Sequence, residues 1–473
     1  MDDPESKQLP HARLHGLAPR TLTPLIFLTL AGCLSSEPRT TPTATPTGFA
    51  ALAQEIAKFR ELPLKRAVAL TNFSALAAAA NDYAPFQTQH VERAYKAIAL
   101  LPNSVDLGKA LIEYRRLERL VVYNEANAAA ALAPNAALLG APFEKSDVVS
   151  AREAPLGFAI VAALQEQNFH WQGKIAGLNL EDRRLAFRAL ATGDAALTIV
   201  ARARGESSGN LSTSDLISIA QLAAALDEPA ARLPNFLRHR LVFPYREGSQ
   251  FVLWALKAKG WPGVNAVYGN PPLSSAQILH PEKYFAQLES PLHFFPASLI
   301  RRMKEGPLVE QSIGEYLLRA MLATEFAAKL ASERASPWRG DQLFAFHDGA
   351  DFVTAWFSSW KTQNDAVAFQ HSYRTVLEKQ QRVRFAARAG PTATSFTGTS
   401  RDGRGVALQV NGPVVMYLSG VPTNRLSADA EAAWRDLAIE PDSSALPFDS
   451  ARNRHRANKR TYFARRGSNP GAN

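Results

Sequence analysis

The chain has 473 residues, of which 46% are hydrophobic and 20% are charged. This composition is typical of a folded globular protein and excludes global disorder as the main state. The formal net charge is +10, and seven of the basic residues follow Asp449 with no acidic residue after it. No apolar run reaches the ~18–20 residues that a membrane-spanning helix needs.

The N-terminal region has the pattern of an export signal. Arg13 and Arg20 precede a short apolar run at residues 24–30, which leads through Leu-Ala-Gly into Cys33. A basic flank, a short apolar core and small residues at a cleavage site are typical of a secretory signal. Residues 1–33 resemble a bacterial lipoprotein signal, which implies that lipidated Cys33 anchors the chain in a lipid bilayer. The alternative is a plain signal peptide with a chance cysteine.

Residues 34–48 are rich in Pro and Thr, which predicts an extended tether. The following segment, residues 49–335, has the apolar spacing of a mainly α-helical domain. We expect helices with intervening turns over residues 49–145, with Leu117–Tyr123 as a candidate strand. Further helices are expected over residues 150–171, 180–204, 213–226, 246–260 and 307–334.

Residues 336–425 predict a small α+β unit. The first expected hairpin pairs residues 342–347 with 351–360, and the second pairs 406–410 with 414–418 around an Asn-Gly turn. A helix is expected over residues 364–382. From 426 to 473 we expect a disordered basic tail. Its alternative role is contact with an anionic envelope polymer or anionic lipid.

Several motifs together carry a resemblance to a known enzyme family. The chain resembles, from about residue 55 to 420, a family of secreted, predominantly helical zinc metallopeptidases of the gluzincin type. Trp338–Asp341 and Asp365–Phe369 are similar to the C-terminal unit of that family. The four main motifs are Ala163–Phe169 (ALQEQNF), Arg188–Ala195 (RALATGDA), Pro244–Gly248 (PYREG) and Pro271–Tyr284 (PPLSSAQILHPEKY).

In the active pattern, two histidines at i and i+4 of a His-Glu-x-x-His helix bind zinc, and the glutamate between them is the general base. A carboxylate from the next helix completes the site. Here Phe158 and Ala162 stand at the histidine positions, because the segment reads Phe-Ala-Ile-Val-Ala. Ala159 stands at the general base and Thr192 at the downstream ligand. The resemblance therefore implies the fold of a zinc peptidase with no catalytic residue, no metal and no cofactor.

The leading prediction is a catalytically inactive, metallopeptidase-like lipoprotein of a bacterial envelope, at the outer membrane or the periplasmic face. It would bind a peptide or protein ligand in a retained cleft, or act as a scaffold or regulator. An anchored location disfavours nucleic acid as a partner. The candidate cleft residues are Glu166, His170, Tyr245, Glu247, Ser274, Gln277 and His280.

Two alternatives remain open from the sequence. One is a hydrolase with a relocated active site built on Glu247 and His280, joined by Glu166 or His170. The other is a purely structural envelope lipoprotein, in which the anchor and the basic tail matter and the cleft does not. Individual residues also have ordinary interpretations: His280 as a structural residue that holds its loop by a hydrogen bond, and Glu166 with His170 as an incomplete ligand pair.

Overall fold

The computed structural model describes residues 48–74, 76, 88–144, 149–205, 213–386 and 394–442. The expected signal with Cys33, nearly all of the tether, and residues 443–473 of the expected tail lie outside the described residues. None of the helices in the described segments combines the length and the apolar character required to cross a bilayer.

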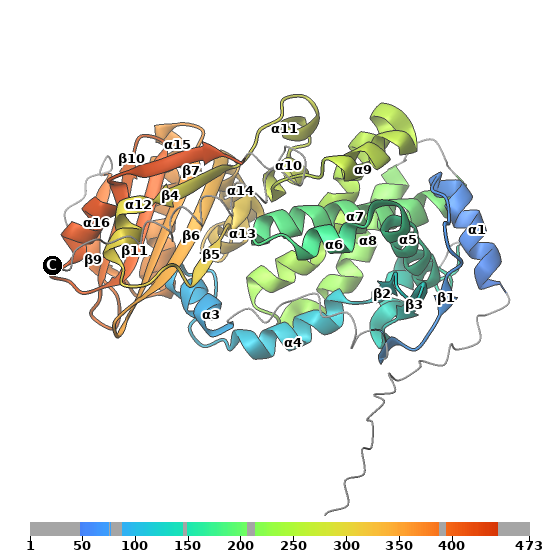
Figure 1. Ribbon diagram of the computed structural model, residues 1–473, viewed down its shortest axis with the longest axis horizontal. Coiled ribbons are helices and arrows are strands. Elements are labelled where there is room, and N and C mark those ends of the chain that lie inside the picture. Colours follow the sequence, from blue (N-terminus) through green and yellow to red (C-terminus); the bar gives the residue numbers. More distant parts are fainter. Residues whose placement is uncertain are drawn as a thin grey trace, which may run out of the picture. The chain divides into compact units, whose positions relative to one another are not determined.

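The first part of the described chain mixes helices with short strands (Figure 1). Strand β2 begins within the expected strand Leu117–Tyr123, whereas β1 and β3 were not expected. Both are alanine-rich, and alanine favours helix when no tertiary contact intervenes. The strands pair in the order β1-β3-β2, with β1 parallel and β2 antiparallel to β3. The elements are α1 (Phe49–Arg60), β1 (Ala69–Leu70), α3 (Thr88–Ala97), α4 (Leu107–Glu118), β2 (Val121–Asn124), β3 (Ala129–Leu132) and η1 (Pro134–Phe143).

Long helices form the centre of the described chain, as the apolar spacing predicts. The expected helix over residues 246–260 begins earlier, at Asn235, and continues through Pro244. It kinks at Lys259 and Gly260, where Gly260 has a φ of 62°. The elements are α5 (Ala154–Phe169), α6 (Trp171–Ala176), α7 (Glu181–Arg202), α8 (Thr213–Asp227), η2 (Pro229–Arg232), α9 (Asn235–Gly269), α10 (Ser275–Leu279) and α11 (Glu282–Phe285).

The C-terminal part is built on an antiparallel sheet. Among the described residues its strand order is β5-β6-β7-β11-β10-β9-β8, and β4 pairs separately with β12. The elements are β4 (Leu292–Pro296), α12 (Ala297–Arg302), β5 (Val309–Gln311), α13 (Gly314–Leu322), α14 (Ala328–Ala335), β6 (Trp338–Asp348), β7 (Asp351–Trp360), α15 (Gln363–Gln380), β8 (Arg384–Phe385), β9 (Ser395–Thr399), β10 (Gly405–Asn411), β11 (Val414–Val421), α16 (Leu426–Trp434) and β12 (Leu437–Pro441).

Both expected hairpins are confirmed. Asp348 pairs with Asp351, and Asn411 pairs with Val414, across two-residue turns. The turn residues Gly349 and Gly412 have φ values of 68° and 57°, a left-handed conformation that glycine adopts without steric cost. The mainly α fold class with a small C-terminal α+β unit is likewise confirmed.

Two expected boundaries in this region are wrong. The expected helix over residues 307–334 is instead β5, α13 and α14, because Gly314, with a φ of 78°, breaks the helix and lies against the carboxylate of Asp182. The folded part also continues past residue 425, since Leu426, Ala430 and Ala433 of α16 are buried in the apolar cluster beneath the sheet. The sheet unit therefore begins before residue 336 and ends after residue 425.

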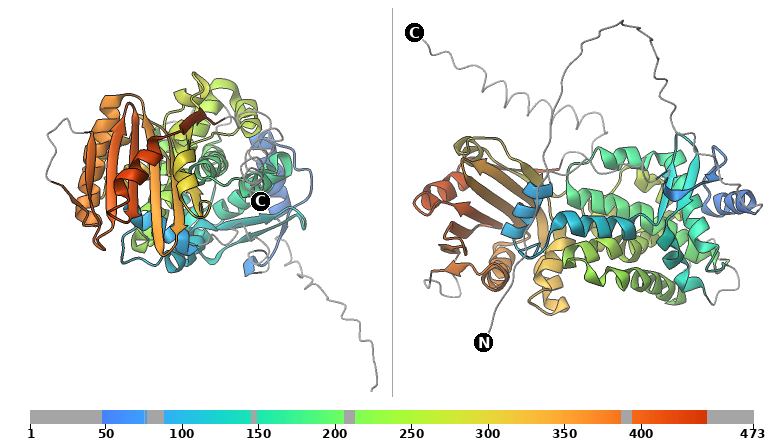
Figure 2. Two further views of the ribbon diagram at one scale, coloured as in Figure 1. Left: turned by 60° about the vertical axis from the view of Figure 1, so that its left-hand side comes forward. Right: turned by 90° about the horizontal axis from the view of Figure 1, so that it is seen from below.

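The helical and sheet regions share one apolar core, which runs from Phe49 of α1 to Tyr417 of β11. Hydrogen bonds join the regions through the end of α3. The Tyr373 hydroxyl donates to the Ile98 carbonyl at 3.1 Å, and the Tyr417 hydroxyl donates to the Ala97 carbonyl at 2.9 Å. Figure 2 shows α3 beside the sheet from two further sides. Packing against the sheet thus fixes α3, the helix that precedes α4 and β2 in the chain.

Candidate functional site

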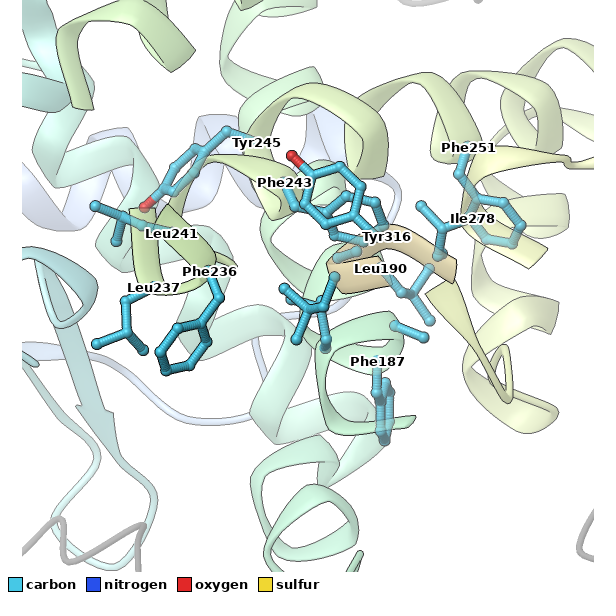
Figure 3. Packing of buried hydrophobic residues seen from close by; sticks show 14 of the residues in the cluster. Phe187, Leu190, Phe236, Leu237, Leu241, Phe243, Tyr245, Phe251, Ile278 and Tyr316 are labelled. Atoms are coloured by element: carbon cyan, nitrogen blue, oxygen red, sulfur yellow. The ribbon is translucent and has the colours of Figure 1, made fainter. Parts of the chain in front are cut away.

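Helix α5 is a core helix, buried on nearly all sides. A Cβ atom on Gly157 would lie 2.6 Å from a methyl carbon of Ile199 in α7, so the missing side chain lets the two helices approach closely. On its other side α7 packs against α9, α10 and α13. Figure 3 shows Phe187 and Leu190 of α7 together with Phe243 of α9 and Tyr316 of α13 in this layer.

A fully buried ion pair ties α1 to α7. The Arg60 guanidinium donates from Nε to Asp194 Oδ1 at 2.7 Å and from a terminal nitrogen to Oδ2 at 3.1 Å, and both side chains are 0% exposed. Asp194 also accepts hydrogen bonds from Gln165 at 3.1 Å and from the Tyr268 hydroxyl at 2.8 Å. The aspartate of the RALATGDA motif is therefore a structural residue that fixes α5, α7 and α9 relative to one another.

A partly open cavity of about 180 Å³ lies where α5, α7, α9 and β2 meet. Phe158, Ala162 and Gln165 of α5 line it at positions i, i+4 and i+7, on one helix face. From α7, Arg184, Arg188 and Thr192 line it at i, i+4 and i+8. The remaining lining residues are Glu118, Arg119, Leu120, Val121, Val122, Tyr123, Leu139, Trp171, Gln172, Ile175, Ala191, Ala195 and Tyr245.

Of the four positions that the resemblance assigns to a zinc site, three line this cavity and one does not. Phe158, Ala162 and Thr192 line the same cavity, and Ala162 and Thr192 are half-buried. Ala159 is fully buried and is not among the lining residues. Phe158 forms one wall but leaves the cavity open.

One wall of the cavity carries a buried ionic cluster. Arg188 is paired with the Glu118 carboxylate and lies 2.9 Å from the Tyr114 hydroxyl, which donates to Glu118 at 2.7 Å. Burial by itself would raise the pKa of Glu118, but the charges of Arg188 and Arg240 and the Tyr114 hydrogen bond outweigh it, so this pKa is lowered. Glu118 is therefore ionised and already engaged by neighbouring donors.

Several other polar lining groups are hydrogen-bond donors, although the side chains of Gln165, Gln172 and Thr192 also offer acceptor oxygens. Arg119 is half-buried, and Arg184 donates from Nε to the Leu178 carbonyl at 2.6 Å. The indole N–H of Trp171 is buried without an acceptor among the described residues. Burial raises the pKa of Tyr245 to about 12, so its hydroxyl keeps its proton at neutral pH. The cavity is therefore rich in donors and in positive charge.

Strand β2 lies at an edge of its sheet and lines the cavity. The backbone N–H of Ala133 donates to the Leu120 carbonyl at 2.9 Å. Alternation along an antiparallel pair then directs the backbone groups of Val121 and Tyr123 away from β3. The Tyr123 carbonyl accepts a bond from the Gln172 side chain at 3.3 Å.

Of the candidate cleft residues, Tyr245 alone is among those lining this cavity. Ser274 and Gln277 are buried and cap α10: the Ser274 side chain accepts from the Gln277 backbone N–H at 3.4 Å, and the Gln277 amide oxygen accepts from the Leu273 N–H at 2.7 Å. His280 Nε2 lies 2.8 Å from the buried carboxylate of Glu315. These three residues hold the α10 loop in place, which is the structural role considered for His280.

Glu247 lies on α9 and is paired with its neighbour Arg246 at 2.9 Å. His280 is paired with Glu315 instead. The two residues therefore have separate partners, and neither is among those lining the cavity. No described contact brings Glu247 and His280 together as one site.

Among the described residues, Glu125, Glu166 and His170 offer ligand atoms that all lie within 4.8 Å of one another. His170 is 63% exposed and its Nδ1 lies 3.1 Å from Glu125. Glu166 accepts the backbone N–H of Gln172 at 2.9 Å, and its charge acts on Lys174. This group has the donor types for a divalent cation, but it also has protein partners sufficient for an ordinary ionic cluster at the α5–α6 junction.

Sequence reasoning missed the arginines and Glu118 of the cavity. A signal was available in α7, where Arg184, Arg188 and Thr192 recur every four residues along one face of a largely apolar helix. No comparable signal exists for Arg119, which ends α4 and reaches the cavity through the packing of that helix.

Comparisons with known proteins reach only the sheet region. A family model described as "Domain of unknown function (DUF8575)" matches residues 301–429, from α12 to α16. The matched segment contains the large sheet, and the cavity-lining residues lie outside it. No curated protein and no solved structure matches the chain.

Proposed function

We propose that this protein is a catalytically inactive, metallopeptidase-like binding protein that holds a peptide or protein segment in the cavity between α5, α7 and β2. The observation that carries the proposal is that Phe158, Ala162 and Thr192 line one cavity. These are three of the positions at which the resemblance requires zinc chemistry. Phenylalanine and alanine offer no lone pair to zinc, and a neutral threonine hydroxyl is a poor substitute for a carboxylate.

The same proposal includes the location and the other partners. The chain is an exported lipoprotein of a bacterial envelope, anchored in a bilayer through lipidated Cys33. Its basic C-terminal end contacts anionic lipid or an anionic envelope polymer. The support for these two points is the sequence pattern alone: the small residues before Cys33 and the seven basic residues after Asp449.

Restoring the ligands tests the proposal. The triple variant Phe158→His, Ala162→His, Thr192→Glu should bind one zinc per chain, because two imidazoles one helical turn apart and a carboxylate on the facing helix complete a tetrahedral site with water. Zinc is measured by elemental mass spectrometry after gel filtration. The matched control keeps Thr192 and carries the two histidines alone; it should bind zinc more weakly by about tenfold or more. A folded triple variant without zinc would contradict the proposed relation to a zinc peptidase.

A further inference from the structure

We infer that the cavity recognises a carboxylate, specifically the free C-terminal carboxylate of a peptide whose last side chain is apolar. The inference rests on the proposed function, because it names the ligand class of the same cavity. The described lining residues include three arginines and one glutamate, namely Arg119, Arg184, Arg188 and Glu118. Glu118 is already engaged by Arg188 and by Tyr114, so the lining keeps an excess of positive charge.

An uncharged donor adds to this preference. Tyr245 lines the cavity, and burial raises the pKa of its hydroxyl to about 12, so the hydroxyl keeps its proton at neutral pH. An incoming carboxylate supplies acceptor oxygens for such a donor. Arginine is also the side chain best suited to carboxylates, because its planar fork donates two parallel hydrogen bonds.

The apolar part of the lining defines what accompanies the carboxylate. Phe158, Ala162, Leu139 and Ile175 provide hydrocarbon surface beside the arginines. The volume of about 180 Å³ exceeds the roughly 150 Å³ of an apolar cavity that accommodates benzene. One aromatic or aliphatic terminal side chain therefore fits. A phosphate or sulfate would satisfy the donors but would leave this apolar surface unfilled.

The test uses the full chain and three fluorescent probes measured by anisotropy. The probes are the peptide Ala-Ala-Ala-Phe with a free carboxylate, the same peptide as its C-terminal amide, and an amidated peptide with an internal Asp. We expect the free acid to bind about tenfold or more tightly than its amide. If the Asp peptide binds as well as the free acid, the carboxylate is recognised but its source is a side chain, and the terminal assignment is overturned.

Arg119→Met should remove most of the preference for the acid over the amide, since methionine retains an unbranched apolar side chain but not the charge or the donors of arginine. The matched control is Arg116→Met on the same helix, where Arg116 is exposed, pairs with Glu113 and is not a lining residue; it should leave the preference unchanged. Arg184→Lys retains the charge and is expected to weaken acid binding less than Arg119→Met.

Two outcomes separate this inference from the proposed function. Equal binding of the acid and the amide would overturn the carboxylate inference. If the cavity-filling change Ala162→Leu then abolishes this binding, the cavity remains a binding site, as the proposed function requires. Cleavage of the probe peptides, with the preference for the acid intact, would overturn inactivity and support the carboxylate inference. Failure of all three probes to bind at millimolar concentration would overturn the inference. Circular dichroism confirms that each variant is folded.

Discussion

Replacing Asp194 with alanine is expected to lower the free energy of unfolding by about 3–5 kcal/mol. The change leaves the fully buried Arg60 guanidinium without its counter-ion and removes an acceptor from Gln165 and from Tyr268. An uncompensated buried charge is far more costly than the ion pair is favourable. Urea titration monitored by tryptophan fluorescence measures the effect.

The matched control is Glu113→Ala, which removes an exposed partner of Arg116 and should cost less than about 1 kcal/mol. The double variant Arg60→Met, Asp194→Leu should recover much of the lost stability, because it removes both charges and retains apolar volume. A loss for Asp194→Ala no larger than that of the control would show that Asp194 does not hold the helices together.

The second large effect is expected for Gly248→Ala. A Cβ atom at Gly248 would lie 2.1 Å from the carbonyl oxygen of Ala189, and one at Gly193 would lie 2.2 Å from the carbonyl carbon of Gly248. These contacts join the backbones of α7 and α9, so no side-chain rotation can relieve them. We expect a loss of about 3 kcal/mol, at the upper end of typical overpacking costs.

Gly173→Ala is the control for this prediction. Gly173 lies in α6, and a Cβ atom added there would meet no neighbouring group within 4 Å. Replacing an unconstrained helical glycine by alanine is expected to stabilise the protein by about 0.5–1 kcal/mol. If Gly248→Ala and Gly173→Ala shift stability in the same direction, the close approach of α7 and α9 is not required for the fold.

The sequence predicted the long helices and both hairpins because those elements carry local signals. Residues 154–164 of α5 form a continuous apolar segment, and the Asn-Gly pair at residues 411–412 marks the turn of the second hairpin. Strands β1 and β3 could not be predicted from their own residues, since β1 becomes a strand through pairing with β3, and alanine-rich β3 through pairing with both β1 and β2. Strand β5 is three residues long and depends on its partner β6 in the same way.

Only the part of the candidate site that lies on long helices could be predicted from the sequence. The positions that the resemblance assigns to zinc ligands lie on two helices with fixed periodicity. Phe158, Ala162 and Thr192 are therefore expected to share a space once α5 and α7 pack together. Arg119 enters from the end of a separate helix, where nothing local indicates its destination. His280 and Gln277, by contrast, belong to a motif of the resemblance but hold the α10 loop in place, His280 through Glu315 of α13 and Gln277 through the Leu273 N–H.

The metal content of the native protein decides whether the proposed inactivity holds, and elemental mass spectrometry after purification without chelators measures it. We expect zinc and other transition metals well below one per chain, since the cavity offers Phe158, Ala162 and Thr192 where ligands would be required. One zinc per chain would contradict the proposal. Loss of that zinc in His170→Ala would then assign the metal to the group of Glu125, Glu166 and His170.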